Sequence, residues 1–370
     1  MTKQVLTGIV VVLIIGSIMF FELQKPERPS SNGGNSDIAV NMTKEEKARQ
    51  YEPAKEISTP DGFINTQGKP ITIGEFVGKK VVLLDIWTYS CINCQRTLPY
   101  LNAWQEKYKD QGLEIIGLHT PEFDFEKKYD NVVAAVKKFG IQYPVVLDND
   151  FFTWNAYGNR YWPRKYLIDI DGFVVYDHIG EGGYEETEKK IQELLQERMA
   201  TLGEKGSISS ATVKPAGAQT EIYANSPETY FGAARNSNLG NGSAGQVGMQ
   251  SFTAPLTIDQ NKLYLAGDWN FTNEYAENAA ANGVILFRYN ARDVYFVASA
   301  ETATNIRVLQ DGKPLGAASG GDVTTVNGES IATIHEDRLY KLIHNETPGE
   351  HILQIIIAAP KIKAFTFTFG

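Results

Sequence analysis

Residues 81–99 read VVLLDIWTYSCINCQRTLP, and this stretch decides the fold. Its first part, 81–87, is a short continuous apolar run, which is typical of a central parallel strand buried on both faces. Residues 100–108 then carry apolar side chains at helical spacing. The sequence therefore predicts that Cys91 and Cys94 open a helix directly after a buried strand.

These two cysteines are the only ones in a chain of 370 residues. A disulfide scaffold would spread its cysteines to close long loops, whereas this pair encloses only Ile92 and Asn93. A structural zinc site usually needs about four cysteine or histidine ligands, and the five histidines show no such spacing near the pair. The pattern predicts redox chemistry without a metal or a bound cofactor, with the Cys91–Cys94 pair itself as the redox-active disulfide.

The position of the pair at a helix start suits thiolate chemistry. The thiolate is the reacting species, and an unperturbed thiol has a pKa of about 8.5. The unpaired N–H groups and partial positive charge of a helix N-terminus favour the thiolate. We expect Cys91, at the helix start, to be the nucleophile and Cys94, one turn further, to resolve the mixed disulfide. No cation lies between them, so an extreme oxidant is not predicted.

Asp85 is a carboxylate within the otherwise apolar run. Burying it without a partner would cost several kcal/mol or raise its pKa. Since it precedes Cys91 by one short stretch, we expect it to lie beneath the pair and to accept the proton of Cys94. The alternative is a structural carboxylate bound to nearby backbone.

The arrangement Asp85, Cys91-x-x-Cys94 and Pro99 resembles the thioredoxin superfamily. Residues 87–96 (WTYSCINCQR) resemble more closely the thioredoxin-like portion of DipZ-type proteins. The earlier stretches 68–70 (GKP) and 78–82 (GKKVV) are similar to the membrane-tethered TlpA group. The resemblance implies an α/β thioredoxin-like fold and a thiol–disulfide oxidoreductase activity.

In that superfamily a cis-proline faces the disulfide, and Trp162-Pro163 matches its position. The resemblance thus implies that Pro163 positions the backbone of the partner. Trp162 is bulkier than the residue usually found there, which suggests a shaped substrate groove. To this groove we also assign Tyr89, Ile92 and Asn93.

Residues 119–123, HTPEF, follow the second predicted strand and belong to the same resemblance. They place His119 and Glu122 near the cysteine pair. A lone histidine at a strand end is more often a structural residue than a functional one.

Strands and helices alternate through this part of the chain. The patterns predict a strand at 113–119, a helix at 131–140, a strand at 143–147, a hairpin at 166–177 and a helix at 184–202. Such alternation predicts an α/β domain whose sheet contains parallel strands, and we bound it at 46–202.

From 219 to 370 the pattern changes to short strands separated by turn residues. The segment 364–369, AFTFTF, alternates and should place its three phenylalanines on one face. These features predict an all-β sandwich, a jelly roll. The half resembles the C-terminal domain of DipZ-type proteins, which is similar to carbohydrate-binding modules. Trp269, Tyr223 and Tyr230 are candidates for a face that binds sugar or a partner protein, or alternatively for core residues.

The N-terminus carries an apolar run, VLTGIVVVLIIGSIMFF, at residues 5–21. Its length is at the lower limit for a helix that spans a bilayer. A cleaved signal peptide is the alternative, but the run lacks the small residues of a cleavage site. We expect an uncleaved anchor at 1–21, followed by a flexible tether at 22–45; a second linker is predicted at 203–218.

Together these features predict a single-pass membrane protein with its catalytic domain on the periplasmic or cell-surface side. The predicted activity is reduction of disulfides in substrate proteins. The resemblance implies a CcdA-like membrane electron donor, because the multi-span electron-transfer domain of DipZ-type proteins does not occur in this sequence. The net charge of −9 argues against a nucleic-acid partner. A disulfide oxidase or isomerase remains an alternative, as does a surface protein that binds glycan or a partner through its β domain.

Overall fold

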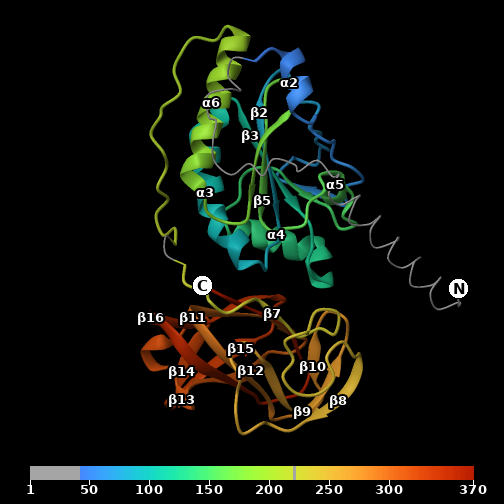
Figure 1. The fold of residues 1–370 in the computed structure, drawn as a ribbon, viewed down its shortest axis with the longest axis vertical. Helices are drawn as coiled ribbons and strands as arrows, with labels where there is room; N and C mark the ends of the chain where they lie inside the picture. Colours follow the sequence, from blue (N-terminus) through green and yellow to red (C-terminus); the bar gives the residue numbers. More distant parts are fainter. Residues whose placement is uncertain (1–41, 220–221) are drawn as a thin grey trace, which may run out of the picture. The chain divides into compact units, whose positions relative to one another are not determined.

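The computed structural model describes residues 42–219 and 222–370, and Thr43–Gly370 forms one compact unit. The predicted anchor at 1–21 and nearly all of the predicted tether at 22–45 lie outside the described residues. Among the helices within the described ranges, none is both long and apolar enough to cross a membrane. The unit contains an α/β part (residues 43–203, the α/β domain) and a β-rich part (residues 222–370, the β domain), which Figure 1 shows.

The α/β domain holds one sheet with the strand order β1-β4-β3-β2-β5-β6. Its strands are β1 (Gly62–Ile64), β2 (Val81–Trp87), β3 (Leu113–His119), β4 (Val145–Leu147), β5 (Arg164–Ile168) and β6 (Val174–Ile179). Its helices are α2 (Lys44–Gln50), α3 (Ile92–Tyr108), α4 (Tyr129–Lys138), α5 (Phe152–Ala156) and α6 (Tyr184–Leu202), with short 3-10 turns η2 (Lys109–Gln111) and η3 (Asp124–Lys127). The pairs β2–β3 and β3–β4 are parallel, and β5–β6 is the predicted antiparallel hairpin.

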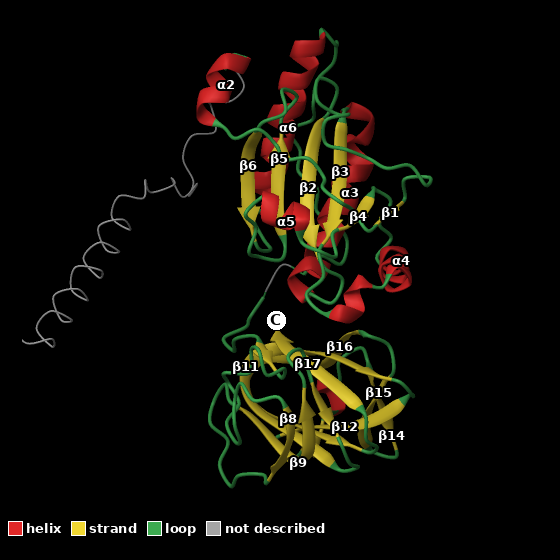
Figure 2. Ribbon diagram, turned by 90° about the vertical axis from the view of Figure 1, so that its right-hand side faces the viewer, coloured by secondary structure: helices red, strands yellow, loops and turns green. Residues whose placement is uncertain are grey.

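Alternation along β2 assigns its side chains to two separate cores. Val81, Leu83 and Trp87 join the core beneath α3, α4 and α6, whereas Val82, Leu84 and Ile86 face the other side of the sheet, where α5 packs. Figure 2 shows the same sheet with α3 and α6 on one face and α5 on the other. Because successive side chains point to opposite faces, Asp85 must lie on the α3 side. Every residue of β2 is buried, as the sequence predicted.

The start of the α/β domain is held by a buried lysine. Helix α2 begins at Lys44, within the predicted tether, and its second lysine, Lys47, is fully buried. The Lys47 ammonium contacts the carboxylates of Asp169 at 2.7 Å and Asp171 at 2.8 Å, and also that of Glu197. These three carboxylates could resemble a cation site, but an ammonium already occupies their centre. The cluster therefore fastens the first helix to β5 and α6.

The predicted linker at 203–218 contains no helix or strand, yet part of it packs against the α/β domain. Ile208 and Val213 contact the core beneath α3 and α6. The carbonyl oxygen of Ala211 accepts a hydrogen bond from Gln192 at 3.1 Å. Part of the linker thus packs against the surface of the α/β domain.

The β domain is all-β, as predicted, and its named strands pair antiparallel in a connected set of eleven. They are β7 (Thr229–Tyr230), β8 (Gly248–Phe252), β9 (Leu263–Phe271), β10 (Ala276–Asn278), β11 (Gly283–Ala300), β12 (Thr304–Gln310), β13 (Lys313–Pro314), β14 (Val323–Val326), β15 (Glu329–Ile334), β16 (Arg338–Ile357) and β17 (Ile362–Phe369), with a 3-10 turn η4 (Gly316–Ala318). The two long strands β11 and β16 pair along nearly their whole length. Their apolar side chains enclose a core of the β domain's own, apart from the two on the faces of the α/β sheet.

The second half of β11 is buried on both faces. Val294, Phe296 and Ala298 face the core of the β domain, whereas Tyr295 and Val297 join the core of the α/β domain. This double burial shows that the two domains share a packed interface.

The prediction that three phenylalanines share one face of the last strand was wrong. Phe367 and Phe369 enter the β-domain core, but Phe365 packs against Phe123 and Phe125 of the α/β domain. The register of β17 against β11 shifts at this point, since Val297 pairs with Thr366 and Ala298 with Ala364. A β-bulge of this kind places an extra residue on the opposite face.

Candidate active site

The two cysteines lie at the start of α3, which follows β2 after a short turn. Cys91 is the N-cap of α3, and its Sγ accepts a hydrogen bond from the backbone N–H of Cys94 at 3.4 Å. Both cysteines are thiols in this structure; Cys91 is partly exposed and Cys94 is buried. The pair is therefore asymmetric, with one sulfur open to a partner and the other facing the protein interior.

Asp85 lies on the same face of the sheet as Cys94 and is only 1% exposed. Among the described residues its Oδ1 has no hydrogen-bond partner. Burial raises the pKa of Asp85 to about 7, against a smaller opposing effect from the positive charge of Lys165. A carboxyl group of this kind exchanges its proton near neutral pH, as a proton acceptor for a thiol requires.

Lys165 is a site residue that the sequence reasoning missed. It pairs with Asp85 across β2 and β5 and is fully buried, and its Nζ donates to the carbonyl oxygen of Gly180 at 3.1 Å. Burial lowers its pKa, while the charges of Asp85 and Cys94 act in the opposite direction. The sequence contained a sign of this role, because a lysine beside the apolar residues YLI is as unusual as an aspartate in β2.

The thiol of Cys94 is held in its neutral form by its surroundings. Burial raises its pKa well above the ordinary value, and its contact with Cys91 acts in the same direction. Two further polar atoms lie near Asp85 without a hydrogen-bond partner among the described residues, the Tyr143 hydroxyl and the Trp87 Nε1. The negative charges of Asp85 and Cys94 add to burial in raising the pKa of Tyr143. A compact buried polar region thus lies behind the second cysteine.

The Trp162–Pro163 peptide bond is cis in this structure. The carbonyl oxygen of Pro163 accepts a hydrogen bond from the N–H of Gly180 at 2.8 Å. Trp162 is half-buried, since its Nε1 donates to the Thr120 carbonyl at 3.0 Å and its ring contacts Trp154 with centroids 4.3 Å apart. The indole is therefore fixed in place at this loop.

The first turn of α3 is held by Arg96, another residue that the sequence reasoning did not single out. Its Nε and Nη2 each donate to a carboxylate oxygen of Glu181 at 2.7 Å, and Nη2 also donates to Asn93 Oδ1 at 2.7 Å. Although burial lowers its pKa, Glu181 outweighs this and raises the pKa above the ordinary value. Asn93, predicted for a substrate groove, is thus tied to the loop that follows β6.

The HTPEF stretch supports the active-site turn through a residue just beyond it, Glu126. This buried carboxylate accepts hydrogen bonds from the N–H and hydroxyl of Ser90, at 3.1 and 2.7 Å, and from the N–H groups of Glu122 and Phe123. Because Ser90 directly precedes Cys91, Glu126 fixes the position of the first cysteine. Burial raises the pKa of Glu126.

His119 is fully buried, and burial lowers its pKa to about 3. Its ring stacks on Tyr89 at 5.7 Å and meets Trp87 edge-on at 5.2 Å. A neutral histidine packed between aromatic rings fits the structural role that the sequence favoured.

Two residues expected at the substrate groove are buried. Tyr89 is 5% exposed, and its hydroxyl donates to the carbonyl oxygen of Asp337 in the β domain at 3.1 Å. Ile92 is also buried and belongs to the core beneath α3. Their placement differs from the expectation because the β domain covers the Tyr89 side of the active-site turn.

The aromatic residues expected at a ligand face of the β domain do not form one. Trp269 is fully buried, and its Nε1 donates to the Ala266 carbonyl at 3.0 Å, so of the two alternatives left open by the sequence it takes the core role. Its alternation along β9 directs it into the core. Tyr223 is 41% exposed. Tyr230 instead packs in the interface between the domains.

Tyr230 is part of a polar contact that joins the domains. Its hydroxyl donates to Glu122 Oε1 at 2.9 Å, and Arg235 Nη1 bonds the same oxygen at 2.7 Å. The Arg235 guanidinium also lies 3.7 Å from the centre of the Tyr230 ring. Glu122, expected near the active site, therefore serves to dock the β domain beside the HTPEF stretch.

Comparisons with known proteins agree with this geometry. A family model described as Redoxin matches residues 31–195, and a model described as a thioredoxin-like C-terminal domain matches residues 226–370. The thiol–disulfide oxidoreductase ResA of Bacillus thuringiensis subsp. konkukian is 33% identical over 155 residues, which cover 42% of this chain and 82% of that protein. The chain belongs to the thioredoxin-like thiol–disulfide oxidoreductases.

This oxidoreductase is also similar to longer proteins. Protein DipZ of Mycobacterium bovis is 42% identical over 276 residues, which are 74% of this chain but only 39% of DipZ. The chain thus spans about two fifths of that relative's length. A thioredoxin-family thiol:disulfide interchange protein of Chlorobium tepidum has a solved structure that is 22% identical, with a TM-score of 0.34, over 40% of this chain and 97% of that one.

Proposed function

We propose that this oxidoreductase reduces disulfide bonds in substrate proteins outside the cytoplasm. The observation that carries the proposal is the asymmetry of the cysteine pair. Cys91 is partly exposed at a helix start, whereas Cys94 is buried with Asp85 on the same side of the sheet. This arrangement separates attack on the substrate from release of the product.

The reaction proceeds through two thiol–disulfide exchanges. The Cys91 thiolate attacks one sulfur of the substrate disulfide, forming a mixed disulfide and releasing the other substrate sulfur as a thiolate. Cys94 then transfers its proton to the Asp85 carboxylate, and its thiolate attacks Cys91 Sγ. This second step forms the Cys91–Cys94 disulfide and releases the remaining substrate thiol, so the substrate gains two electrons. Pro163 and Trp162 serve to align the partner's backbone beside Cys91.

Two features favour the reducing direction. A strongly oxidising pair requires stabilisation of its reduced thiolate form. Here no cation lies between the cysteines, and burial raises the pKa of Cys94. Cys94 of the reduced pair therefore keeps its proton, and the reduced form lacks the thiolate stabilisation that makes a pair oxidising.

We place the enzyme at a membrane through residues 1–21, with the residues between 21 and α2 as a tether. Electrons would reach the Cys91–Cys94 disulfide from a CcdA-like membrane protein. We also propose that the β domain is a sandwich of the jelly-roll type. Since Trp269 is buried, we assign no glycan to it.

The reduction potential of the full chain tests the direction. After equilibration with dithiothreitol or glutathione buffers, a value near that of thioredoxin, roughly −270 mV, would support a reductase. A value near that of DsbA, roughly −120 mV, would instead make the protein a disulfide donor.

A trapping experiment tests the roles of the two cysteines. Cys94→Ser should accumulate a mixed disulfide with a reducible substrate protein, because the second exchange cannot occur. Cys91→Ser is the matched variant and should trap none. Equal trapping by both variants would contradict the assignment of Cys91 as nucleophile.

A further inference from the structure

Two adjoining hollows form one groove along the interface of the domains. Their volumes are about 690 and 350 Å³. They share the residues Gln95, Lys138, Glu336, Arg338 and Leu339. Since the hollows have five lining residues in common, they lie side by side along the interface, and together they are called the groove here.

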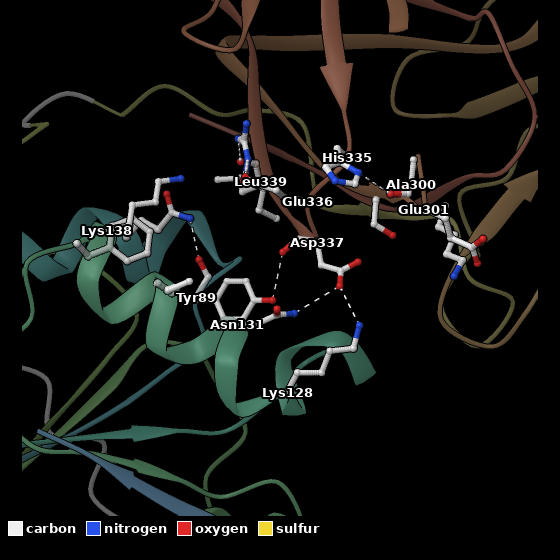
Figure 3. A pocket seen from close by; sticks show the side chains of 17 residues that line it. Tyr89, Lys128, Asn131, Lys138, Ala300, Glu301, His335, Glu336, Asp337 and Leu339 are labelled. Carbon is white, nitrogen blue, oxygen red and sulfur yellow. Dashed lines mark hydrogen bonds and ion pairs between the residues drawn. The ribbon is translucent and has the colours of Figure 1, made fainter. Parts of the chain in front are cut away.

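The two walls of this groove come from different domains, as Figure 3 shows for the larger hollow. One wall is α4 with the start of α3, including Asn131 and Lys138. The opposite wall is the turn between β15 and β16, around Asp337, together with Lys363 of β17. The β domain thus completes a site that the α/β domain does not form alone.

The groove reaches to within one helical turn of the reactive cysteine. Gln95 lines both hollows, and its backbone N–H donates to the carbonyl oxygen of Cys91 at 3.0 Å. Cys91 is the N-cap of α3, so Gln95 lies about one helical turn after it. The Gln95 side chain donates to the Tyr89 carbonyl at 2.8 Å, which fixes it at the end of the groove. A substrate segment linked to Cys91 would have to extend about one helical turn to reach the groove.

The charges along the groove are neutralised unevenly. Asp337 pairs with Lys128 at 3.1 Å, and Arg338 pairs with Glu336 at 2.8 Å. Lys138 is exposed, and within residues 42–219 and 222–370 no carboxylate forms an ion pair with it. Its ammonium lies above the Phe139 ring, 5.6 Å from the ring centroid. An unneutralised cation thus stands in both hollows, near Gln95.

Lys363, on the β-domain wall of the groove, also carries a charge that no carboxylate neutralises among the described residues. Its ammonium lies 5.5 Å from the centre of the Tyr275 ring, and in the described part of the chain it forms no ion pair. Glu301 also lines the larger hollow, and its negative charge is among those that raise the pKa of Lys361. Lys138 lines both hollows with Gln95, whereas Lys363 lines only the larger hollow. Both ammonium groups lack an ion-pair partner among the described residues, so the groove offers two sites for an acidic side chain.

The lining does not suit a sugar. A saccharide ring usually packs on an open aromatic face, and the aromatic rings of Tyr89, Phe139 and Tyr295 line the groove. Tyr89 and Tyr295 are only 5% and 4% exposed, and the Lys138 ammonium lies 5.6 Å from the centre of the Phe139 ring. The mixed lining of amides, charges and small apolar side chains matches a polypeptide better.

We propose that this groove binds an extended segment of the substrate protein that follows its reactive cysteine and carries an acidic side chain opposite Lys138. The inference rests on the proposed function, since it takes a protein disulfide as the substrate. The β domain then acts as a specificity wall, selecting which disulfides reach Cys91.

Peptide binding to the full-length protein tests the groove separately from the redox chemistry. The probes are fluorescent peptides with serine in place of cysteine, followed by either glutamates or lysines, measured by anisotropy at low salt. The wild-type protein should prefer the acidic peptide, and Lys138→Glu should weaken its binding about fivefold, as expected for an exposed ion pair. Lys363→Glu should act in the same direction, and about 0.5 M salt should abolish the preference.

Lys137→Glu is the matched control, because Lys137 neighbours Lys138 on α4 but does not line the groove. Its acidic-peptide affinity should stay within twofold of wild type, on the order of normal assay scatter. If Lys137→Glu and Lys138→Glu lose affinity for the acidic peptide equally, the groove does not bind the substrate segment. The same conclusion follows if the wild-type protein shows no preference for the acidic peptide. Reduction of hydroxyethyl disulfide, which is too small to occupy the groove, should be the same in all variants. If no protein, including the wild type, reduced hydroxyethyl disulfide, the proposed function would be refuted. The peptide-binding data would still show whether the groove binds an acidic segment.

Discussion

Asp85 offers a sharp test of the reasoning because its ionisation costs folding free energy. In the folded protein its pKa is about 7, whereas the ordinary value is 3.8. Between these two pH values the folded state holds a proton that the unfolded state has lost, so the stability falls as the pH rises. At about 1.4 kcal/mol for each tenfold change in proton affinity, the full difference corresponds to about 4 kcal/mol.

Asp85→Asn removes this cost, because an amide does not ionise. The variant should match the wild type near pH 4 and should be more stable at pH 8. Lys165 then loses the carboxylate opposite it, which offsets part of the gain, so we expect about 2 kcal/mol at pH 8. The same substitution should prolong the mixed disulfide in a single-turnover reaction at pH 7, since Cys94 loses its proton acceptor.

Urea unfolding at a series of pH values from 4 to 8 measures the effect on stability. Asp110→Asn, which removes an exposed carboxylate on η2, is the control for a change of net charge. Parallel pH profiles for wild-type protein and Asp85→Asn would refute the argument, because they would mean that Asp85 ionises in the folded state as it does in water.

Two further substitutions probe the packing of the domains. Lys47→Met should lower the free energy of unfolding by about 3–5 kcal/mol, because it leaves three carboxylates together without their ammonium. Lys44→Met, at the exposed start of the same helix, should change it by less than about 0.5 kcal/mol, and similar losses in both would contradict the role of the cluster. Trp269→Ala should cost about 3–5 kcal/mol in urea unfolding, as for a large core residue, and an unchanged stability would show that the indole is not packed as described.

Much of the active site was predictable because it depends on residues that are close in the chain. The strand at 81–87, the helix after it and the thiol pair between them follow from apolar periodicity over a single stretch. Alternation along the strand also places Asp85 on the side of Cys94. Lys165 could have been recognised by the same rule, since it too is a charged residue beside an apolar strand segment.

Other features required contacts between distant parts of the chain. Glu126 lies far from Ser90 in the sequence, and no pattern in either segment predicts the hydrogen bond between them. Phe365 leaves the alternation of its strand because of a bulge that depends on pairing with β11. Trp269 reads equally well as an exposed or a buried residue until the neighbouring strands are known.

The sequence by itself determined the local chemistry: a dithiol at a helix start, a carboxylate in the strand before it, and a separate β-rich half. Only the tertiary structure decided what surrounds that chemistry. The β domain packs against the HTPEF stretch and the start of α3, so Tyr89 becomes an interface residue and Gln95 opens onto a groove. The physical reason is that periodicity reveals which side chains will be buried, whereas the surface that buries them belongs to residues far away in the chain.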